Sequence, residues 1–269
     1  MKRHLFLVWV LVCMTLHLSA QSRSEGRNYP ITRSTMYGLG TMNLYDTYLS
    51  PVEYEGVQAR VLRESSRTMQ WCDEKVSRQV LFQGHVGMAM NRAETSNELS
   101  GMVNWNYALH YNISLFDGRL RLLAGPMMQV HGGFIYNTRN GNNPAQAKLY
   151  TNVAASGMAL YNINWKRCPI TLRYQVDVPV MGVMFSPEYG QSYYEIFSLG
   201  HTEGTVHFTS LHNQPTMRHW LTADVNFRKL TLRVGYMADM QQTSVGGLKS
   251  HDYSSSFMVG FVKNLRIID

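Results

Sequence analysis

The sequence has few cysteines and, after its first residues, no long apolar run. Three cysteines in 269 residues are too few for a fold built on disulfides. Two of them, Cys72 and Cys168, lie beyond the N-terminal region, and the sequence leaves open whether they pair. A membrane helix needs about 18 consecutive apolar residues, and no internal segment supplies them. A small disulfide-rich fold and a bundle of membrane helices are therefore both excluded.

The sequence also lacks the motifs of a metal, cofactor or nucleic-acid site. Its ten histidines are scattered, without the Cys-x-x-Cys or His-Glu-x-x-His spacing that holds zinc. Neighbouring glycines such as Gly38 and Gly40 fall inside expected strands, whereas a phosphate loop would join a strand to a helix. The formal net charge of +7 is not accompanied by a Lys/Arg-rich run or an RNA-binding motif. We expect no cofactor, no metal and no nucleic-acid partner.

The N-terminus has the composition of a secretory signal peptide. Basic residues precede an apolar run that is too short to span a bilayer, and small residues precede Gln21. We predict cleavage near Ala20. The expected division of the chain is a signal peptide at 1–20, an N-terminal periplasmic segment at 21–34 and a membrane barrel at 35–269.

Alternation of apolar and polar residues is what the sequence has in abundance. From Thr171 to Val180 every second side chain is apolar, and most of the others are polar or charged. A period of two is typical of an extended strand between an environment that excludes charge and one that accepts it. The pattern recurs along most of the chain, with Tyr and Trp near strand ends as in interfacial girdles. It predicts an all-β fold, a single closed antiparallel transmembrane β-barrel in the cell outer membrane.

The alternating segments indicate about twelve strands. They lie near residues 36–48, 54–64, 79–91, 101–113, 119–136, 147–163, 170–180, 190–198, 204–213, 217–227, 230–241 and 253–265. An even number returns both chain ends to the periplasm. Short turns at 116–118 and 228–229 would then face the periplasm, and loops at 140–144 and 244–252 would face outward. The link from 65 to 77 would be unusually long for a periplasmic turn.

Two alternatives to twelve strands stay open. Eight or ten strands are possible, because the segment 184–204 could be one folded loop. A soluble two-sheet sandwich also fits, because alternation alone does not distinguish lipid from a protein core. Strands of ten residues or more and the aromatic strand ends favour the membrane barrel.

Charged residues on the polar strand faces are the first candidate site. A functional interpretation makes them a constriction that selects anionic solutes. The other interpretation is a network of ion pairs that fills a narrow barrel, and the presence of both signs on the same strands favours it. The residues are Arg60, Arg121, Arg173, Asp177, Arg218, Asp224, Arg233 and Asp239.

The segment 185–197 is the second candidate, since it combines aromatic rings with two acids and hydroxyls. Exposing so many rings to water is unfavourable. They should pack into the lumen, join the outer girdle, or contact a ligand or partner. The residues expected to do so are Tyr189, Tyr193, Tyr194, Glu195 and Phe197.

Ser210 and His212 are a weaker, catalytic candidate. They lie two apart on an expected strand, as a serine nucleophile and its base would. Outer-membrane phospholipase has a similar His and Ser on a strand of its barrel, but in the opposite order and with a calcium-binding pattern that this chain lacks. We therefore expect no enzymatic activity, with a lipid hydrolase as the alternative.

Three stretches resemble an uncharacterised outer-membrane β-barrel family of Bacteroidetes, catalogued as a domain of unknown function. They are the Asn-rich run 137–145, the block 178–200 that contains Phe185-Ser-Pro-Glu-Tyr189, and Phe208-Thr-Ser210 with Asn213. The resemblance covers almost the whole mature chain. It implies the location and the fold, and it supplies no catalytic residues.

These observations lead to three functional hypotheses. The first is a narrow pore or a barrel that binds a small solute, a surface ligand or a partner. The second is the lipid hydrolase, and the third is a structural barrel with a plugged lumen, anchoring a partner through the turn at Trp71 and Cys72. Outer-membrane lipid is an expected partner in each case. The oligomeric state is left open.

Overall fold

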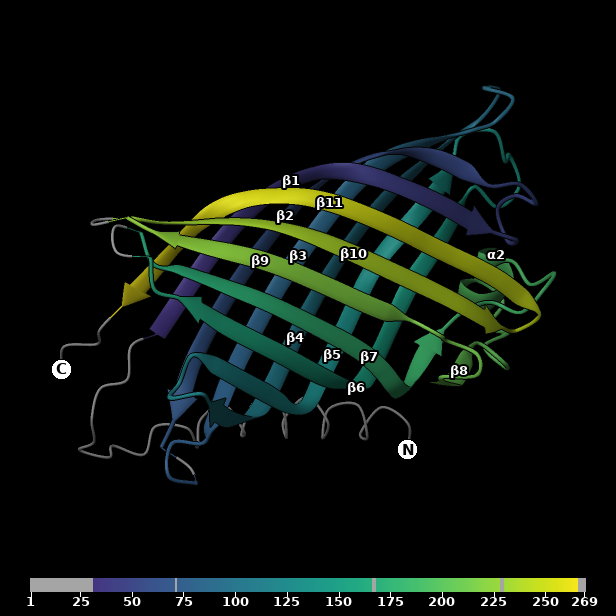
Figure 1. Ribbon diagram of the computed structural model, residues 1–269. Coiled ribbons are helices and arrows are strands. Elements are labelled where there is room, and N and C mark those ends of the chain that lie inside the picture. The colour runs from purple at the N-terminus through teal and green to yellow at the C-terminus, as the bar shows by residue number, and fades with distance from the viewer. Residues whose placement is uncertain (1–30, 71, 166–167, 228–229, 266–269) are drawn as a thin grey trace.

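The computed structural model describes residues 31–70, 72–165, 168–227 and 230–265. They form eleven strands and one short helix (Figure 1). The elements are β1 (Ile31–Asp46), β2 (Tyr54–Met69), β3 (Val76–Asn91), β4 (Asn97–Leu115), β5 (Leu120–Asn137), β6 (Ala145–Ile163), β7 (Ile170–Phe185), α2 (Tyr193–Phe197), β8 (Val206–Ser210), β9 (Met217–Asn226), β10 (Thr231–Val245) and β11 (Leu248–Leu265). The predicted signal peptide lies outside the described residues, and the barrel begins at Ile31, earlier than the predicted 35.

The strands close into a ring of ten. Each strand pairs antiparallel with its neighbours, β1 pairs with both β2 and β11, and β6 pairs with β7. The first half of β7 pairs with β9 and its last residues pair with β8. Since β8 and β9 pair with successive parts of β7 and run in the same direction, they occupy a single position in the ring. The fold is therefore an all-β closed antiparallel barrel of ten strands, one of the smaller counts that the sequence left open.

Two of the twelve predicted strands are wrong, and the cause is local. The segment 190–198 contains α2, because Ser192 and Glu195 form a capping box that begins a helix. The segments 204–213 and 217–227 make one interrupted strand. Residues 211–216 leave the sheet between β8 and β9, and Asn213 bonds back to the backbone of Ser210.

A bulge in β7 lies opposite that interruption. The register between β6 and β7 shifts between Val153 and Ala154, whose partners are Met181 and Pro179. Val180 is thus the extra residue. Proline has no N–H to donate, and bulges are among the few places where a sheet accepts it.

The two ends of the barrel differ. The terminal end carries Ile31 at the start of β1 and the links β2–β3, β4–β5, β6–β7 and β9–β10. The link 70–75 is shorter than the predicted link 65–77, because β2 continues to Met69 and β3 begins at Val76. The loop end carries 47–53, 92–96, 138–144 and 186–205. At this end the expected loop 244–252 is a tight hairpin, with Gly246 and Gly247 at φ of 59° and 73°, the conformation that a two-residue turn requires.

The alternation divides the side chains between the two faces as predicted. Trp105 and Tyr111 of β4 point outward, whereas Asn104 and His110 point into the lumen and are buried. The outer face is dominated by large apolar groups, with Leu39 72% and Phe257 75% exposed. Apolar exposure of this extent is unusual on a water-soluble protein. Among the described residues, no helix is long and apolar enough to cross a membrane.

Candidate functional site

Glu64 is the centre of a network in the terminal half of the lumen. Its Oε1 lies 2.6 Å from Arg173 Nη1, and its Oε2 lies 2.6 Å from Arg233 Nη1. Gln79 donates to Oε1 at 2.7 Å. Since Glu64 is on β2 and the arginines are on β7 and β10, these bonds cross the barrel. All three charged groups are buried, where paired charges are tolerated only with good geometry and further hydrogen bonds.

Trp220 lies beside this network. Its ring is 4.2 Å from Arg173 Cζ and 5.9 Å from Arg233 Cζ, distances at which a guanidinium stacks favourably on an indole. The residue is fully buried and belongs to an apolar layer across the lumen. The other members of that layer are Met36, Leu62, Leu81, Met237 and Met258.

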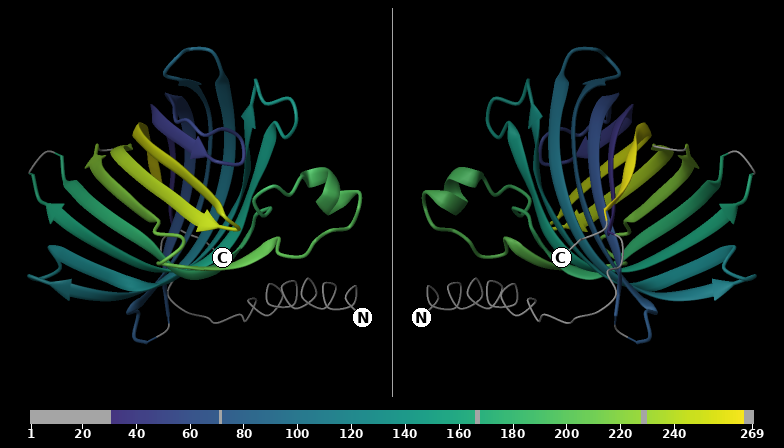
Figure 2. Two further views of the ribbon diagram at one scale, coloured as in Figure 1. Left: turned by 90° about the vertical axis from the view of Figure 1, so that its right-hand side faces the viewer. Right: turned by 90° about the vertical axis from the view of Figure 1, so that its left-hand side faces the viewer.

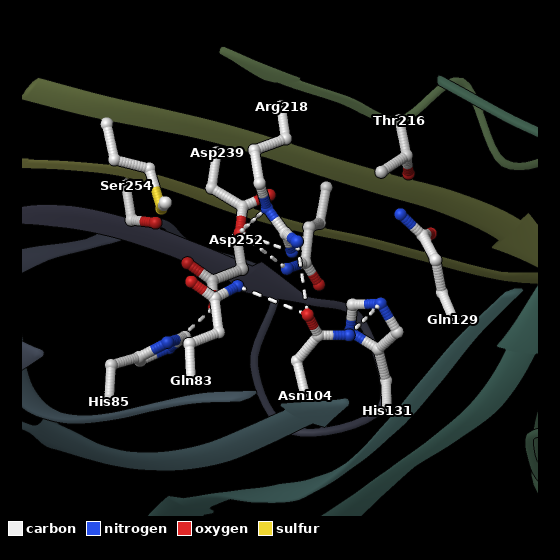
Figure 3. Close-up of polar contacts among 12 residues, drawn as sticks. Gln83, His85, Asn104, Gln129, His131, Thr216, Arg218, Asp239, Asp252 and Ser254 are labelled. Atoms are coloured by element: carbon white, nitrogen blue, oxygen red, sulfur yellow. Dashed lines mark hydrogen bonds and ion pairs between the residues drawn. The ribbon is translucent and has the colours of Figure 1, made fainter. Parts of the chain in front are cut away.

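A second polar network fills the middle of the lumen (Figure 3). Arg218 Nη2 lies 3.0 Å from Asp239 Oδ2, and Arg60 Nη1 lies 3.6 Å from the same oxygen. Arg218 also donates to Asn104 Oδ1 at 3.1 Å. The Asn104 amide contacts His131 Nε2 at 2.6 Å. As in the first network, each arginine is matched by acceptors from other strands.

The loop half of the lumen is closed by apolar groups and one ion pair. Leu49 of the loop 47–53 is buried in a cluster with Met42, Leu44, Tyr54, Ala89 and Ile135. Lys148 Nζ lies 2.5 Å from Asp46 Oδ2. A cavity between this cluster and the middle network, lined in part by Met102 and Tyr150, measures about 20 Å³. That volume holds about one water molecule.

The eight predicted lumen charges all project inward, but not into one site. Arg60, Arg173, Arg218, Arg233 and Asp239 are buried in the two networks, and Asp177 is buried beside Gln175, which bonds to both Asp177 and Arg173. Arg121 and Asp224 are half-buried and line a cavity at the terminal end. The interpretation as a filled interior describes this arrangement better than an open constriction, because both signs are paired at short distance.

Sequence reasoning missed several charged residues of the lumen. Glu64 is the most important, although it continues the inward positions of Arg60 and Leu62 at a spacing of two. The spacing of two was the signal in the sequence that could have identified Glu64 as a lumen residue. Others missed include Asp46, Glu98, Lys148, His85 and Asp252, of which His85 and Asp252 lie 3.4 Å apart.

Tyr193 anchors the aromatic segment at the loop end. Its hydroxyl donates to Gln146 Oε1 at 2.8 Å and accepts from the Ala147 N–H at 2.7 Å. Its ring packs edge-on against Tyr48 at 5.6 Å. Desolvation by the surrounding groups raises the pKa of the Tyr193 hydroxyl well above its usual value. The hydroxyl therefore stays neutral as a donor and acceptor.

The rest of this segment is fixed but exposed. Glu195 accepts from the backbone N–H and the hydroxyl of Ser192, and these bonds lower the pKa of its carboxyl. Tyr189, Tyr194 and Phe197 are 66–77% exposed. Phe197 stacks against Phe185, which lies at the end of β7, with ring centroids 6.2 Å apart. Figure 2 shows that α2 lies beside the ring of strands and not inside it.

Ser210 and His212 do contact each other. The Ser210 hydroxyl bonds to Nδ1 of His212 where β8 ends. His212 is exposed, and within the described part of the chain no carboxylate bonds to its ring to orient it. A catalytic triad needs such an orienting group.

The two cysteines of the described chain, Cys72 and Cys168, are both free thiols. No three His, Cys, Asp or Glu residues among those described are placed to hold a metal ion. Trp71, the other residue of the predicted anchoring turn, lies outside the described residues.

Comparisons with known proteins found one family and several structural neighbours. A family model described as "Protein of unknown function (DUF3316)" matches residues 5–269. No curated protein matches the chain. The outer membrane protease OmpT from Escherichia coli is similar with a TM-score of 0.49 and 6% identity, over 90% of this chain and 99% of that one. The transport unit of the autotransporter AIDA-I from Escherichia coli has a TM-score of 0.44 and 6% identity, over 91% of this chain and 93% of that one.

Proposed function

Since the chain belongs to the DUF3316 family of proteins of unknown function, we propose that it is an outer-membrane β-barrel that acts by binding and not by conducting solutes. The observation that carries this proposal is the lumen, which is crossed by two networks. Around Glu64, ion pairs join β2 to β7 and β10. Around Asp239, bonds join β10 to β2 and, through Arg218 and Asn104, β9 to β4. The plugged barrel is thus preferred to the narrow pore.

The outer surface supports a membrane location. Strands such as β4 and β6, with 19 residues each, are longer than the roughly 9–11 residues that a tilted strand needs to cross a bilayer. Their outward side chains are mostly apolar or aromatic. With the short turns in the periplasm, the loop end faces the cell exterior. A Bacteroidetes origin and cleavage near Ala20 stay predictions.

Uptake into proteoliposomes tests the closed lumen. Vesicles that contain the refolded protein should swell in isotonic arabinose no faster than protein-free vesicles, because no continuous path crosses the two networks. Rapid swelling in proportion to the amount of folded barrel would support a pore instead.

We assign the exposed aromatic segment 186–205 to contact with outer-leaflet lipid. Phe197 stacks on Phe185, whose cross-strand partners Leu149 and Val206 are among the exposed outward groups. The aromatic surface of α2 therefore continues the apolar outer face of the barrel. Aromatic side chains are favoured at this level of a membrane, where one end of the ring is apolar and the other is hydrated.

Spin labelling can test this contact after both thiols, Cys72 and Cys168, are replaced by serine. A nitroxide at Tyr194→Cys should collide more often with oxygen, which concentrates in lipid, than with a water-soluble nickel chelate. The matched control is Asn142→Cys, on an exposed position of the loop 138–144, where the nickel chelate should dominate. Equal behaviour of the two labels would exclude the lipid contact.

A second candidate function, lipid hydrolysis, rests on the contact between Ser210 and His212. It requires that phospholipid hydrolysis by the detergent-folded protein be lost in both Ser210→Ala and His212→Ala. Activity that survives either substitution, or its absence in the unmodified protein, removes this candidate.

A further inference from the structure

The terminal end of the barrel contains a cavity that the proposed function does not use. It measures about 350 Å³, within the range of small-ligand sites. Its lining comes from the last residues of β2, β6 and β9 and the first residues of β1, β3, β5, β7 and β10. The Glu64 network forms part of its wall, since Glu64, Arg173 and Arg233 all line it.

The charges of this cavity are not balanced. Three inward-pointing arginines line it, Arg121, Arg173 and Arg233, against two carboxylates, Glu64 and Asp224. The carboxylates are already engaged. Both oxygens of Glu64 bond to arginines, and both oxygens of Asp224 bond to Arg233, at 2.6 and 2.7 Å.

One arginine is therefore left over. Within the described residues, Arg121 has no carboxylate partner. Arg121 is half-buried on an inward position of β5, with Leu160 as its direct partner on β6 and Leu123 next along its own strand face. A guanidinium beside apolar side chains is poorly solvated on that side, which strengthens its attraction for an anion.

We propose that this cavity binds a small oxyanion ligand, one that carries a carboxylate or phosphate group, with Arg121 as its main contact. The planar guanidinium presents paired N–H donors that match two oxygens of either group. The engaged pairs Glu64–Arg173 and Asp224–Arg233 hold the wall in place, so the site requires no rearrangement of the lumen.

Calorimetric titration of the detergent-folded protein tests the site with three probes: inorganic phosphate, citrate and a short-chain phosphatidic acid below its micellar concentration. Binding of phosphate or citrate indicates a free anion as the ligand, and binding of phosphatidic acid alone indicates a lipid headgroup. In either case Arg121→Gln should weaken the binding at least about tenfold, the usual effect of losing a charge-assisted contact.

Arg63→Gln is the matched control. Arg63 lies near the same end of β2, but it points outward and is exposed, so its replacement removes the same charge from outside the cavity. Binding by this variant should equal that of the unmodified protein. The proposal is overturned if none of the three probes binds, if Arg121→Gln binds normally, or if both variants lose binding equally. None of these results bears on whether the lumen conducts.

Discussion

Replacing Glu64 by glutamine should lower the free energy of unfolding by about 3–5 kcal/mol, the usual consequence of removing one partner from a buried ion pair. Glutamine keeps the size of the side chain but removes the negative charge that Arg173 and Arg233 share at 2.6 Å. Both guanidinium groups would then be buried without sufficient counter-charge. Urea titration of the barrel in lipid vesicles, followed by the heat-modifiable migration of the folded form, measures the loss.

Glu55→Gln is the control for this experiment. Glu55 is on the same strand, but it is exposed near the loop end, where a single charge contributes little to stability. Its unfolding midpoint should stay close to that of the unmodified protein. If Glu64→Gln unfolds at the same urea concentration as Glu55→Gln, the network does not stabilise the barrel as described.

Trp220→Ala should also lower the free energy of unfolding by about 3–5 kcal/mol, because it leaves a large cavity in the middle of the lumen. The indole is 1% exposed and packs within the layer of Met36, Leu62 and Met237. It also supplies the ring next to Arg173. Trp220→Phe keeps an aromatic face and part of the volume, so this substitution should lower the free energy of unfolding by less than Trp220→Ala does.

Trp105→Ala provides the comparison for this substitution. The same side chain is removed, but Trp105 points outward and is 37% exposed. Trp105→Ala leaves no internal cavity, so it should lower the free energy of unfolding clearly less than Trp220→Ala does. The assignment of Trp220 to the core of a filled lumen fails if the two alanine variants lose the same stability in the same urea titration.

Which residues share a strand face could be predicted from the sequence, because this depends only on the alternation of neighbouring residues along the strand. Period-two alternation fixes which side chains share a face, and so it predicted that Arg218 and Asp224 lie together on the lumen side. Closure follows from the same pattern, since an outer face that is apolar on nearly every strand needs a closed sheet.

The number of strands could not be read from alternation alone. Tyr193, Tyr194, Ile196 and Phe197 have high strand propensity, and this suggested a strand where α2 lies. The competing signal was present in the sequence: Ser192 and Glu195 have the spacing of a capping box. Likewise, Pro215 is a residue that interrupts a ladder of hydrogen bonds, and it lies between β8 and β9.

The pairing of charges across the lumen was beyond the reach of the sequence. Glu64 and Arg173 are 109 residues apart, and Glu64 and Arg233 are 169 apart. Whether they meet depends on strand number and register, which set the width of the barrel and the height of each residue. The same holds for the excess of arginines at the terminal end, which becomes visible only when the partners of Glu64 and Asp224 are known.

Planar-bilayer recording of the refolded, unmodified barrel tests the central claim, a lumen filled by its own side chains, most directly. Protein shown to be folded by its heat-modifiable migration should insert without producing discrete current steps in molar potassium chloride. The networks around Glu64 and Asp239 leave ions no continuous aqueous path. Steps of reproducible size, in proportion to the folded protein added, would contradict a closed lumen.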